Sequence, residues 1–373
     1  MPEHLPLVEA LPRDWRDASF MGRIDTGAGP TPIVVRDGVV YDMSRVAPTV
    51  SALIEARAFE GGTRIGDLAA IDTAHLLSPI DLHCVKAAGV TFAVSALERV
   101  IEERARGDHH RAAEVRGRIE DTLGGNIRAV VPGSPEAAAL KDVLIADGLW
   151  SQYLEVAIGP DAEIFTKAPV LSTVGLSAQI GVRSDSTWNN PEPEIVLVAD
   201  SHGQAVGATL GNDVNLRDFE GRSALLLGKA KDNNASCALG PLIRLFDAGF
   251  AMDDVRRADV SLTIAGTDGY VLKGASNMRE ISRDPEDLLA QAMSEHHYPD
   301  GLVLFCGTLF APTQDRDEPG RGFTHKPGDV VTIASDKLGT LVNTVTTSRD
   351  APPWRFGVGA LMRNLAARGL LAA

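Results

Sequence analysis

Short apolar runs with regular punctuation dominate the chain after residue 155. They are rich in Val, Ile, Leu and Thr and are separated by Gly, Asp and Pro, which is typical of β-strands joined by turns. We predict strands at residues 194–200, 205–214, 259–265, 270–274, 302–310, 329–335 and 340–347. We predict helices at residues 236–248, 284–295 and 357–371. Many strands with few intervening helices indicate an α+β fold rather than a doubly wound sheet.

The pattern before residue 150 predicts one hairpin and several helices. The hairpin turns at Asp37-Gly38, between two apolar runs. The predicted helices are residues 51–59, residues 95–123 with a break at 107–110, and residues 134–147, which open with Ser134-Pro135. On this pattern we expect a small N-terminal α/β domain at residues 1–80 and a larger domain at residues 81–373.

Composition and charge narrow the class of protein. The chain has 373 residues, 44% of them hydrophobic, and a formal net charge of −14. The acidic balance argues against nucleic acid as a partner, because neutralising phosphates requires clustered Lys and Arg. No apolar run approaches the roughly 20 residues of a membrane-spanning helix, and the first residues lack the features of a signal peptide. Three widely spaced cysteines do not form a disulfide framework, so we expect a cytoplasmic protein.

The most informative polar residues are three acids that flank one predicted hairpin. Glu192 and Glu194 are two residues apart at the start of a strand, so the period of two places both side chains on the same face. If the next predicted strand returns antiparallel to it, Asp213 ends beside the two glutamates. Three converging carboxylates repel each other unless a cation neutralises them. Such hard oxygen ligands predict a Mg²⁺ site, in which Ca²⁺ or Mn²⁺ can substitute.

The same residues have a simpler interpretation. An E-x-E pair alone is more often two solvated acids at a strand edge, and Asp213 is then an ordinary turn residue. A short motif of this kind is a hypothesis that its sequence context must support.

That context resembles the fumarylacetoacetate hydrolase superfamily. The family pattern is E-x-E, then N-D-x-S-A-R-D, then a lysine nine residues ahead of Gly-Pro. Here Glu192-x-Glu194 is followed by Asn212-Asp213 and Arg217-Asp218, and Lys231 lies nine residues ahead of Gly240-Pro241. The resemblance covers roughly residues 80–347, including Gly307-Thr308 and Gly328-Asp329. It implies a mostly-β roll with appended helices, a homodimer or homotetramer, and metal ligation by Glu192, Glu194 and Asp213.

One departure bears on the reaction. Hydrolytic members of the family carry G-x-N-Y-x-x-H-x-x-E, whose His and Glu activate water. The matching stretch here runs from Gly89 to Glu98 and has Ser95 at the His position. Serine is a poor general base near neutral pH, so the hydrolytic pair is incomplete. The stretch instead resembles the branch that dehydrates 2-keto-3-deoxy-pentonates to 2-oxoglutarate semialdehyde, as does the segment Glu163-x-Phe165-x-Lys167.

These observations predict an enzyme, a metal-dependent hydro-lyase of pentose or sugar-acid catabolism, with a small 2-keto acid as substrate. The candidates for proton transfer are Lys231 and Glu163, and Lys231 can equally stay charged and hold the enolate oxygen. Ser95 and Thr308 are candidates to bind the substrate, and Arg217 to support a carboxylate near the metal. Two alternatives remain open: a C–C bond hydrolase of acylpyruvates or diketo sugar acids, and a non-catalytic metal- or metabolite-binding protein.

Overall fold

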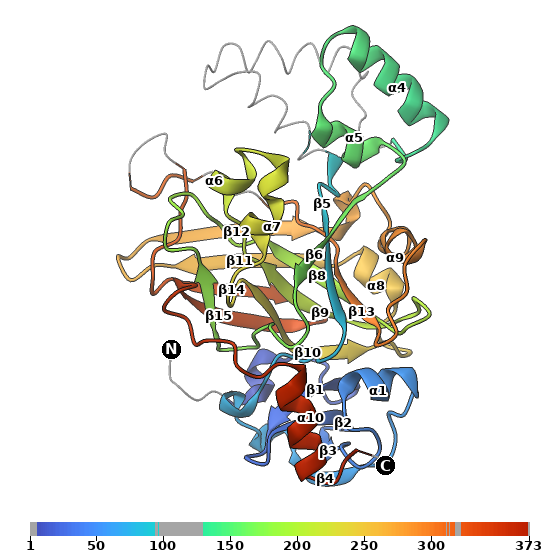
Figure 1. The fold of residues 1–373 in the computed structure, drawn as a ribbon, viewed down its shortest axis with the longest axis vertical. Coiled ribbons are helices and arrows are strands. Elements are labelled where there is room, and N and C mark those ends of the chain that lie inside the picture. The colour runs from blue at the N-terminus through green and yellow to red at the C-terminus, as the bar shows by residue number, and fades with distance from the viewer. Residues whose placement is uncertain are drawn as a thin grey trace.

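The computed structural model describes residues 6–93, 96, 130–310, 312, 314–317 and 322–371. Within these ranges two β-sheets form the body of the molecule, and short helices surround them (Figure 1). The α+β class predicted from the sequence is therefore confirmed. None of the helices in the described ranges is both long enough and apolar enough to span a membrane.

The larger sheet joins strands from the first 70 residues with strands from the middle of the chain and β13, in the order β4-β3-β2-β1-β10-β9-β8-β13-β5-β6. Its strands are β1 (Phe20–Asp25), β2 (Pro30–Arg36), β3 (Val39–Asp42), β4 (Thr63–Asp67), β5 (Cys84–Gly89), β6 (Glu163–Ala168), β8 (Pro193–Ala199), β9 (Ala205–Asp213), β10 (Cys237–Leu245) and β13 (Leu302–Phe305). β1 pairs with β10, so the first strands extend the sheet that the later strands build. The domain boundary at residue 80 stays a prediction.

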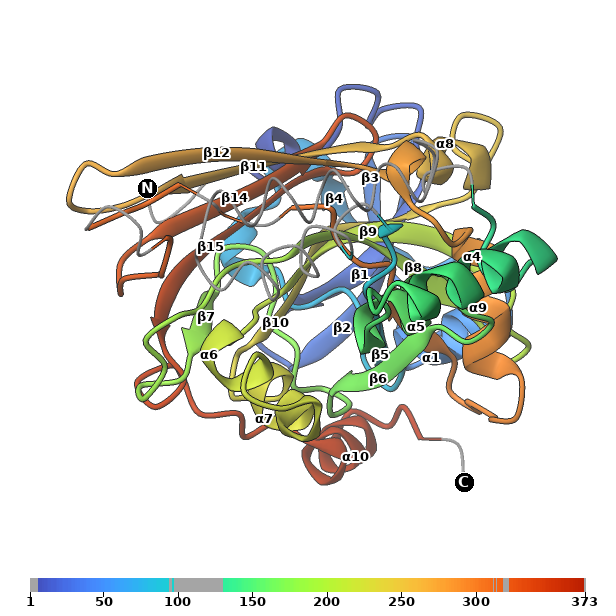
Figure 2. The same cartoon turned by 90° about the horizontal axis from the view of Figure 1, so that it is seen from above.

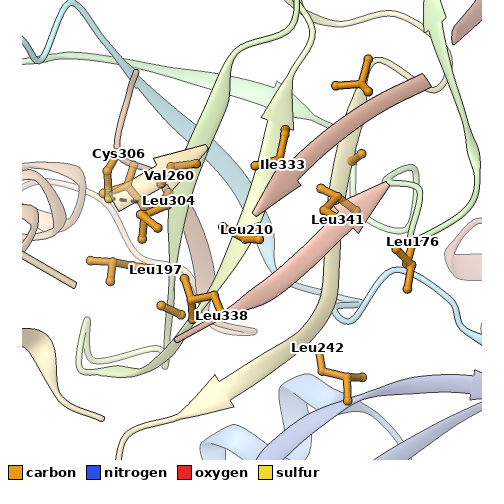
Figure 3. Close-up of a cluster of buried hydrophobic side chains, with 14 of the residues drawn as sticks. Leu176, Leu197, Leu210, Leu242, Val260, Leu304, Cys306, Ile333, Leu338 and Leu341 are labelled. Atoms are coloured by element: carbon orange, nitrogen blue, oxygen red, sulfur yellow. Dashed lines mark hydrogen bonds between the residues drawn. The ribbon is translucent and has the colours of Figure 1, made fainter. Parts of the chain in front are cut away.

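The smaller sheet has the order β12-β11-β14-β15-β7. Its strands are β7 (Gln179–Val182), β11 (Asp259–Ala265), β12 (Val271–Asn277), β14 (Val330–Ser335) and β15 (Gly339–Thr347). One cluster of buried apolar side chains contains residues from both sheets, and the two sheets therefore share a core. Figure 3 shows Leu197 and Leu210 of the larger sheet beside Ile333 and Leu341 of the smaller one.

Both faces of the central strand β8 are covered, which explains its uninterrupted apolar sequence. Ile195 and Leu197 belong to the core between the sheets, whereas Val196 and Val198 belong to a second cluster on the opposite face. Every residue of the strand is buried. The end of β8 that carries the glutamates is consequently fixed by packing on two sides.

The helices lie around the sheets and at the two ends of the molecule. They are α1 (Val50–Glu55), α4 (Pro135–Ala146), α5 (Gln152–Ile158), α6 (Arg217–Glu220), α7 (Leu227–Lys231), α8 (Met252–Arg256), α9 (Pro285–Met293) and α10 (Val358–Ala367). α10 lies with β1 to β4 at one end of the long axis, and α4 and α5 lie at the other end (Figure 1). α6 and α7 follow β9 and lie side by side in both views (Figures 1 and 2).

One prediction from the sequence is wrong. Residues 236–248 were predicted as a helix, but β10 occupies Cys237–Leu245 as a fully buried strand between β9 and β1. Gly240, at φ 152°, and Pro241 interrupt the segment, and Pro is strongly unfavourable inside a helix because it lacks the N–H that the helix needs. The continuous apolar run has no period that distinguishes a buried strand from a buried helix.

Most other predicted elements are present with shifted ends. The hairpin around Asp37-Gly38 is formed by β2 and β3, and the strands predicted at 194–200 and 205–214 are β8 and β9. The helix predicted at residues 51–59 ends earlier, at Glu55, and the strand predicted at 302–310 ends at Phe305. The helix predicted at residues 95–123 lies almost entirely outside the described residues.

Candidate metal centre

The β8–β9 hairpin brings the three predicted acids together. Glu194 pairs with Gly211, and the backbone N–H of Asp213 donates to the carbonyl oxygen of Glu192 at 3.0 Å. The antiparallel return predicted from the sequence is therefore present. One carboxylate oxygen from each of Glu192, Glu194 and Asp213 lies within 4.8 Å of the others, and all three side chains are buried.

Hydrogen-bond donors hold each of the three acids. The side-chain amide of Asn215 donates to Oε1 of Glu192 at 3.0 Å, and the backbone N–H of Gly307 donates to Oε2 of Glu194 at 2.6 Å. The ammonium of Lys231 contacts Oε2 of Glu192 and lies 3.0 Å from Oδ2 of Asp213. These contacts leave the carboxylates little rotational freedom.

Burial and charge act in opposite directions on the acids. Burial raises the pKa of Glu194 well above its ordinary value, and the neighbouring Asp213 and Glu192 carboxylates raise it further. Burial also raises the pKa of Glu192, although Lys231 opposes it. For Asp213, burial is outweighed by the ammonium groups of Lys167 and Lys231, so its pKa is lowered. The trio therefore contains one stably ionised acid and two acids whose charge is unfavourable without a cation.

Lys231 forms ion pairs with two acids of the trio, Glu192 and Asp213. Burial lowers its pKa, but the carboxylates of Asp213, Glu192 and Glu220 outweigh burial, and the pKa ends above its ordinary value. The protonated side chain is thus the stable form beside these acids.

The donor set fits a hard divalent cation. Carboxylate oxygens are the ligands that Mg²⁺ and Ca²⁺ prefer, and the three acids supply them from one small region. Oδ1 of Asp213 is buried without a hydrogen bond of good geometry from any described residue, although Nζ of Lys167 lies 2.8 Å away. An acceptor in that state has capacity for a metal ligand bond. Within the described residues, this donor group consists of carboxylate oxygens without a thiolate or imidazole, so it matches Mg²⁺ better than zinc.

The trio forms one wall of a pocket. Besides the three acids, its lining residues are Ala88, Gly89, Val90, Phe92, Glu163, Phe165, Glu220, Leu227, Lys231, Gly307 and Thr308. Polar groups therefore face apolar side chains across the pocket, which is the usual composition of a small-molecule site.

The structure places most of the predicted site residues in this pocket. Lys231 ends α7, Glu163 begins β6, and Thr308 follows β13. Arg217 begins α6, and its guanidinium lies over the ring of Trp188, 4.5 Å from the ring centroid. The predicted support of a carboxylate by Arg217 stays a prediction. Ser95 lies outside the described residues.

Two pocket features escaped the sequence analysis. Glu220 lines the pocket from the end of α6, and Asn215 joins it to the trio, because the Asn215 amide donates to Oε2 of Glu220 at 2.6 Å as well as to Glu192. Glu220 lies three residues after Arg217 on the same short helix, but this spacing alone does not indicate a role in the pocket. Lys167 was noted only as part of a sequence segment, but its ammonium reaches Asp213.

Fold and site together define a two-sheet α+β protein with a buried acidic centre on a β-hairpin. The family model for the C-terminal region of fumarylacetoacetate (FAA) hydrolase matches residues 156–346, just over half of the chain. The chain belongs to this family.

Two curated relatives are identical to this chain at a third of the aligned positions. A probable 2-keto-3-deoxyxylonate dehydratase from Haloferax volcanii is 33% identical over 195 residues, which are 52% of this chain and 64% of the relative. A 2-dehydro-3-deoxy-D-arabinonate dehydratase from Saccharolobus solfataricus is 33% identical over 187 residues, which are 50% of this chain and 59% of the relative. The matches thus span less than two thirds of either relative.

Solved structures share the fold across most of the chain. A 2-keto-3-deoxy-D-arabinonate dehydratase in complex with magnesium and 2,5-dioxopentanoate has a TM-score of 0.63 and 22% identity, covering 88% of this chain and 99% of the other. A fumarylacetoacetate hydrolase from Exiguobacterium antarcticum has a TM-score of 0.54 and 18% identity, covering 88% and 100%. At these identities the likeness establishes the fold, including the predicted mostly-β roll.

Proposed function

We propose that the chain is a Mg²⁺-dependent dehydratase that converts a 2-keto-3-deoxy-pentonate to 2-oxoglutarate semialdehyde. The observation that carries the proposal is the joint placement of the acidic trio, Lys231 and Glu163 in one pocket. The two curated relatives are named as dehydratases of such acids, and the magnesium-bound structural neighbour holds 2,5-dioxopentanoate, which is this semialdehyde.

Glu192, Glu194 and Asp213 would hold the cation. When bound, Mg²⁺ would draw electron density from the 2-keto oxygen of the substrate and so acidify the protons at C3. The reaction then needs one group that accepts a C3 proton and one that donates a proton to the departing C4 hydroxyl. Water leaves, and the product of this step has a C3=C4 double bond beside the C5 alcohol. A proton shift from C5 to C3 then gives the C4=C5 enol. Transfer of the enol hydroxyl proton to C4 gives the aldehyde, so that substrate equals product plus water.

The residues of the pocket divide these roles. Lys231 touches two carboxylates and is protonated, which suits a donor that stabilises negative charge on the substrate. Glu163 faces the same pocket from β6, and a carboxylate can accept the C3 proton and pass it on. Thr308 follows β13 and offers a hydroxyl to the substrate, while Phe92 and Phe165 keep water from part of the pocket.

The test is direct. Purified protein with Mg²⁺ and the D-xylonate- or D-arabinonate-derived 2-keto-3-deoxy acid should release the semialdehyde, measured by NMR or by a coupled dehydrogenase. EDTA should abolish turnover and added Mg²⁺ should restore it. Acylpyruvates serve as the comparison substrates. Pyruvate release from them, with no product from either pentonate epimer, would establish the C–C hydrolase alternative and overturn the dehydratase.

The cellular compartment and the oligomeric state of the enzyme are inferred from its cysteines, its surface and the family resemblance. Cys84, Cys237 and Cys306 are unpaired, which fits the reducing cytoplasm. We also infer a homodimer or homotetramer, as the family resemblance implies, and exposed apolar side chains on α10 such as Val358 and Met362 offer surface for it. Light scattering coupled to gel filtration distinguishes these states from a monomer.

A further inference from the structure

Lys167 is a charged side chain with no exposure to solvent. It belongs to β6, as do Glu163 and Phe165, and it lies at an irregularity of this strand, because the register with β5 shifts between Thr166 and Ala168. Glu163 and Phe165 line the pocket, and Lys167 lies further along the strand. Burying an ammonium group is costly unless it is paired and hydrogen-bonded. Its position therefore depends on the partners that it finds there.

The ammonium of Lys167 meets acceptors from three parts of the site. It lies 2.8 Å from Oδ1 of Asp213 and donates to the backbone carbonyl of Val214 at 3.3 Å. It also donates to the carbonyl oxygen of Lys231 and lies 3.5 Å from Oγ of Ser236. The hydroxyl of Ser236 donates to the same Lys231 carbonyl at 2.8 Å.

These contacts connect a proposed metal ligand to the proposed proton donor. Asp213 lies between two lysines, with Oδ1 at Lys167 and Oδ2 3.0 Å from Lys231. Lys167 also holds the carbonyl at the end of α7, the helix on which the Lys231 side chain is mounted. One buried ammonium therefore fixes both the orientation of Asp213 and the backbone from which Lys231 reaches the pocket.

We propose that Lys167 is a positioning residue that sets the separation between the Asp213 carboxylate and the Lys231 ammonium. It does not line the pocket and so acts through these two residues. The metal-binding part of this inference concerns the chain alone, whereas the part about turnover rests on the proposed function.

Charge and position predict opposite results when Lys167 is neutralised. Lys167→Met removes a positive charge beside Asp213, and charge alone would strengthen Mg²⁺ binding. Loss of position would weaken it, because residues that orient metal ligands typically contribute about 10- to 100-fold to metal affinity. We expect Mg²⁺ affinity, measured by calorimetry without substrate, to fall at least about 10-fold. At saturating Mg²⁺, kcat should stay reduced because Lys231 has moved, while KM changes less.

Two further variants keep the test decisive. Lys167→Arg retains the charge and changes the geometry, so it should also weaken Mg²⁺ binding, and it serves if the Met variant does not fold. Lys86→Met is the matched control: Lys86 lies on the neighbouring strand, bonds to Thr166 at 2.9 Å, and should leave Mg²⁺ affinity unchanged. Wild-type or tighter Mg²⁺ binding in the folded Lys167 variants would overturn the positioning role. If the dehydratase assay fails, the Mg²⁺ affinities of the variants still test the positioning role, because they are measured without substrate.

Discussion

Gly89 and Glu163 face each other in register across β5 and β6, and a Cβ atom on Gly89 would lie 2.2 Å from Oε2 of Glu163. The three atoms closest to such a Cβ all belong to the Glu163 side chain, so a substitution at Gly89 would collide with this side chain and not with the backbone. The Glu163 carboxylate can therefore occupy its position in the pocket because residue 89 is a glycine, which has no side chain.

Gly89→Ala is therefore expected to displace the Glu163 carboxylate without disrupting the strands. Turnover of the 2-keto acid should fall roughly 10- to 100-fold, because small displacements of a reacting group have effects of that size. Mg²⁺ affinity should stay within about two-fold of wild type, because the acidic trio is untouched. Steady-state kinetics and calorimetry measure the two quantities.

The matched control for this prediction is Gly66→Ala. Gly66 also lies in a strand of the larger sheet, and a Cβ atom there would meet nothing within 4 Å. This variant should keep full turnover. Equal losses in both variants would show that the effect at Gly89 is a general cost of strand substitution.

Glu194→Gln separates two effects of the buried Glu194 carboxylate, which are destabilisation of the metal-free fold and binding of Mg²⁺. The glutamine can still accept the backbone N–H of Gly307, so the fold is retained while one charge is removed. Burial and the neighbouring acids raise the pKa of Glu194, so its ionised form destabilises the metal-free fold. The metal-free variant should melt at a higher temperature than wild type at pH 7, while its Mg²⁺ affinity falls more than about 100-fold.

Thermal melts with and without Mg²⁺ check both halves of this prediction. Wild type should gain stability on adding Mg²⁺ because the ion binds the folded state, and Glu194→Gln should gain none. Glu295→Gln, on the exposed surface, is the control and should respond like wild type. A Mg²⁺-dependent rise in the variant equal to that of wild type would exclude Glu194 as a ligand.

The acidic trio could be predicted from sequence because its geometry is local. Glu192 and Glu194 share a face through the period of a strand, and the β8–β9 hairpin that returns Asp213 depends on one turn. The β-rich class was predictable for the same reason, since short apolar runs between turn residues specify strands individually.

What could not be predicted depends on contacts between distant segments. Lys167 reaches Asp213 from β6, and Glu220 reaches the pocket from α6, so neither role has a spacing that identifies it. β10 was predicted as a helix because its apolar run has no period, and its identity as a strand depends on β9 and β1 on either side.

Glu220→Gln tests the fifth acid that lines the pocket, besides Glu163 and the acidic trio. Glutamine can still accept the hydrogen bond from Asn215, so the variant removes charge with little change of shape. A 2-keto acid carries a negative charge, and a pocket with one acid fewer should bind it more tightly. We expect KM to fall about 3-fold with kcat no higher than in wild type. A large loss of kcat would instead place Glu220 at the reacting atoms.

His83 gives a pH dependence that is independent of the active site. Its side chain has no exposure, and neither ring nitrogen has a hydrogen-bond partner among the described residues. Burial lowers its pKa, and the nearby Arg23 lowers it further, while Asp81, 3.9 Å from Nδ1, and Glu55 oppose the shift. The folded state therefore resists protonation that the unfolded chain accepts.

Below about pH 6.5 the unfolded state binds a proton at His83 that the folded state does not, so the free energy of unfolding should decrease as the pH falls. Each such histidine contributes a slope of up to about 1.4 kcal/mol per pH unit. His83→Leu should flatten the dependence measured by chemical denaturation between pH 8 and pH 5, and the remaining slope should include His325, whose pKa burial also lowers. His297→Leu, at an exposed position, serves as the control. Parallel curves for wild type and His83→Leu would contradict this prediction. They would show that His83 binds a proton to the same extent in the folded and the unfolded state.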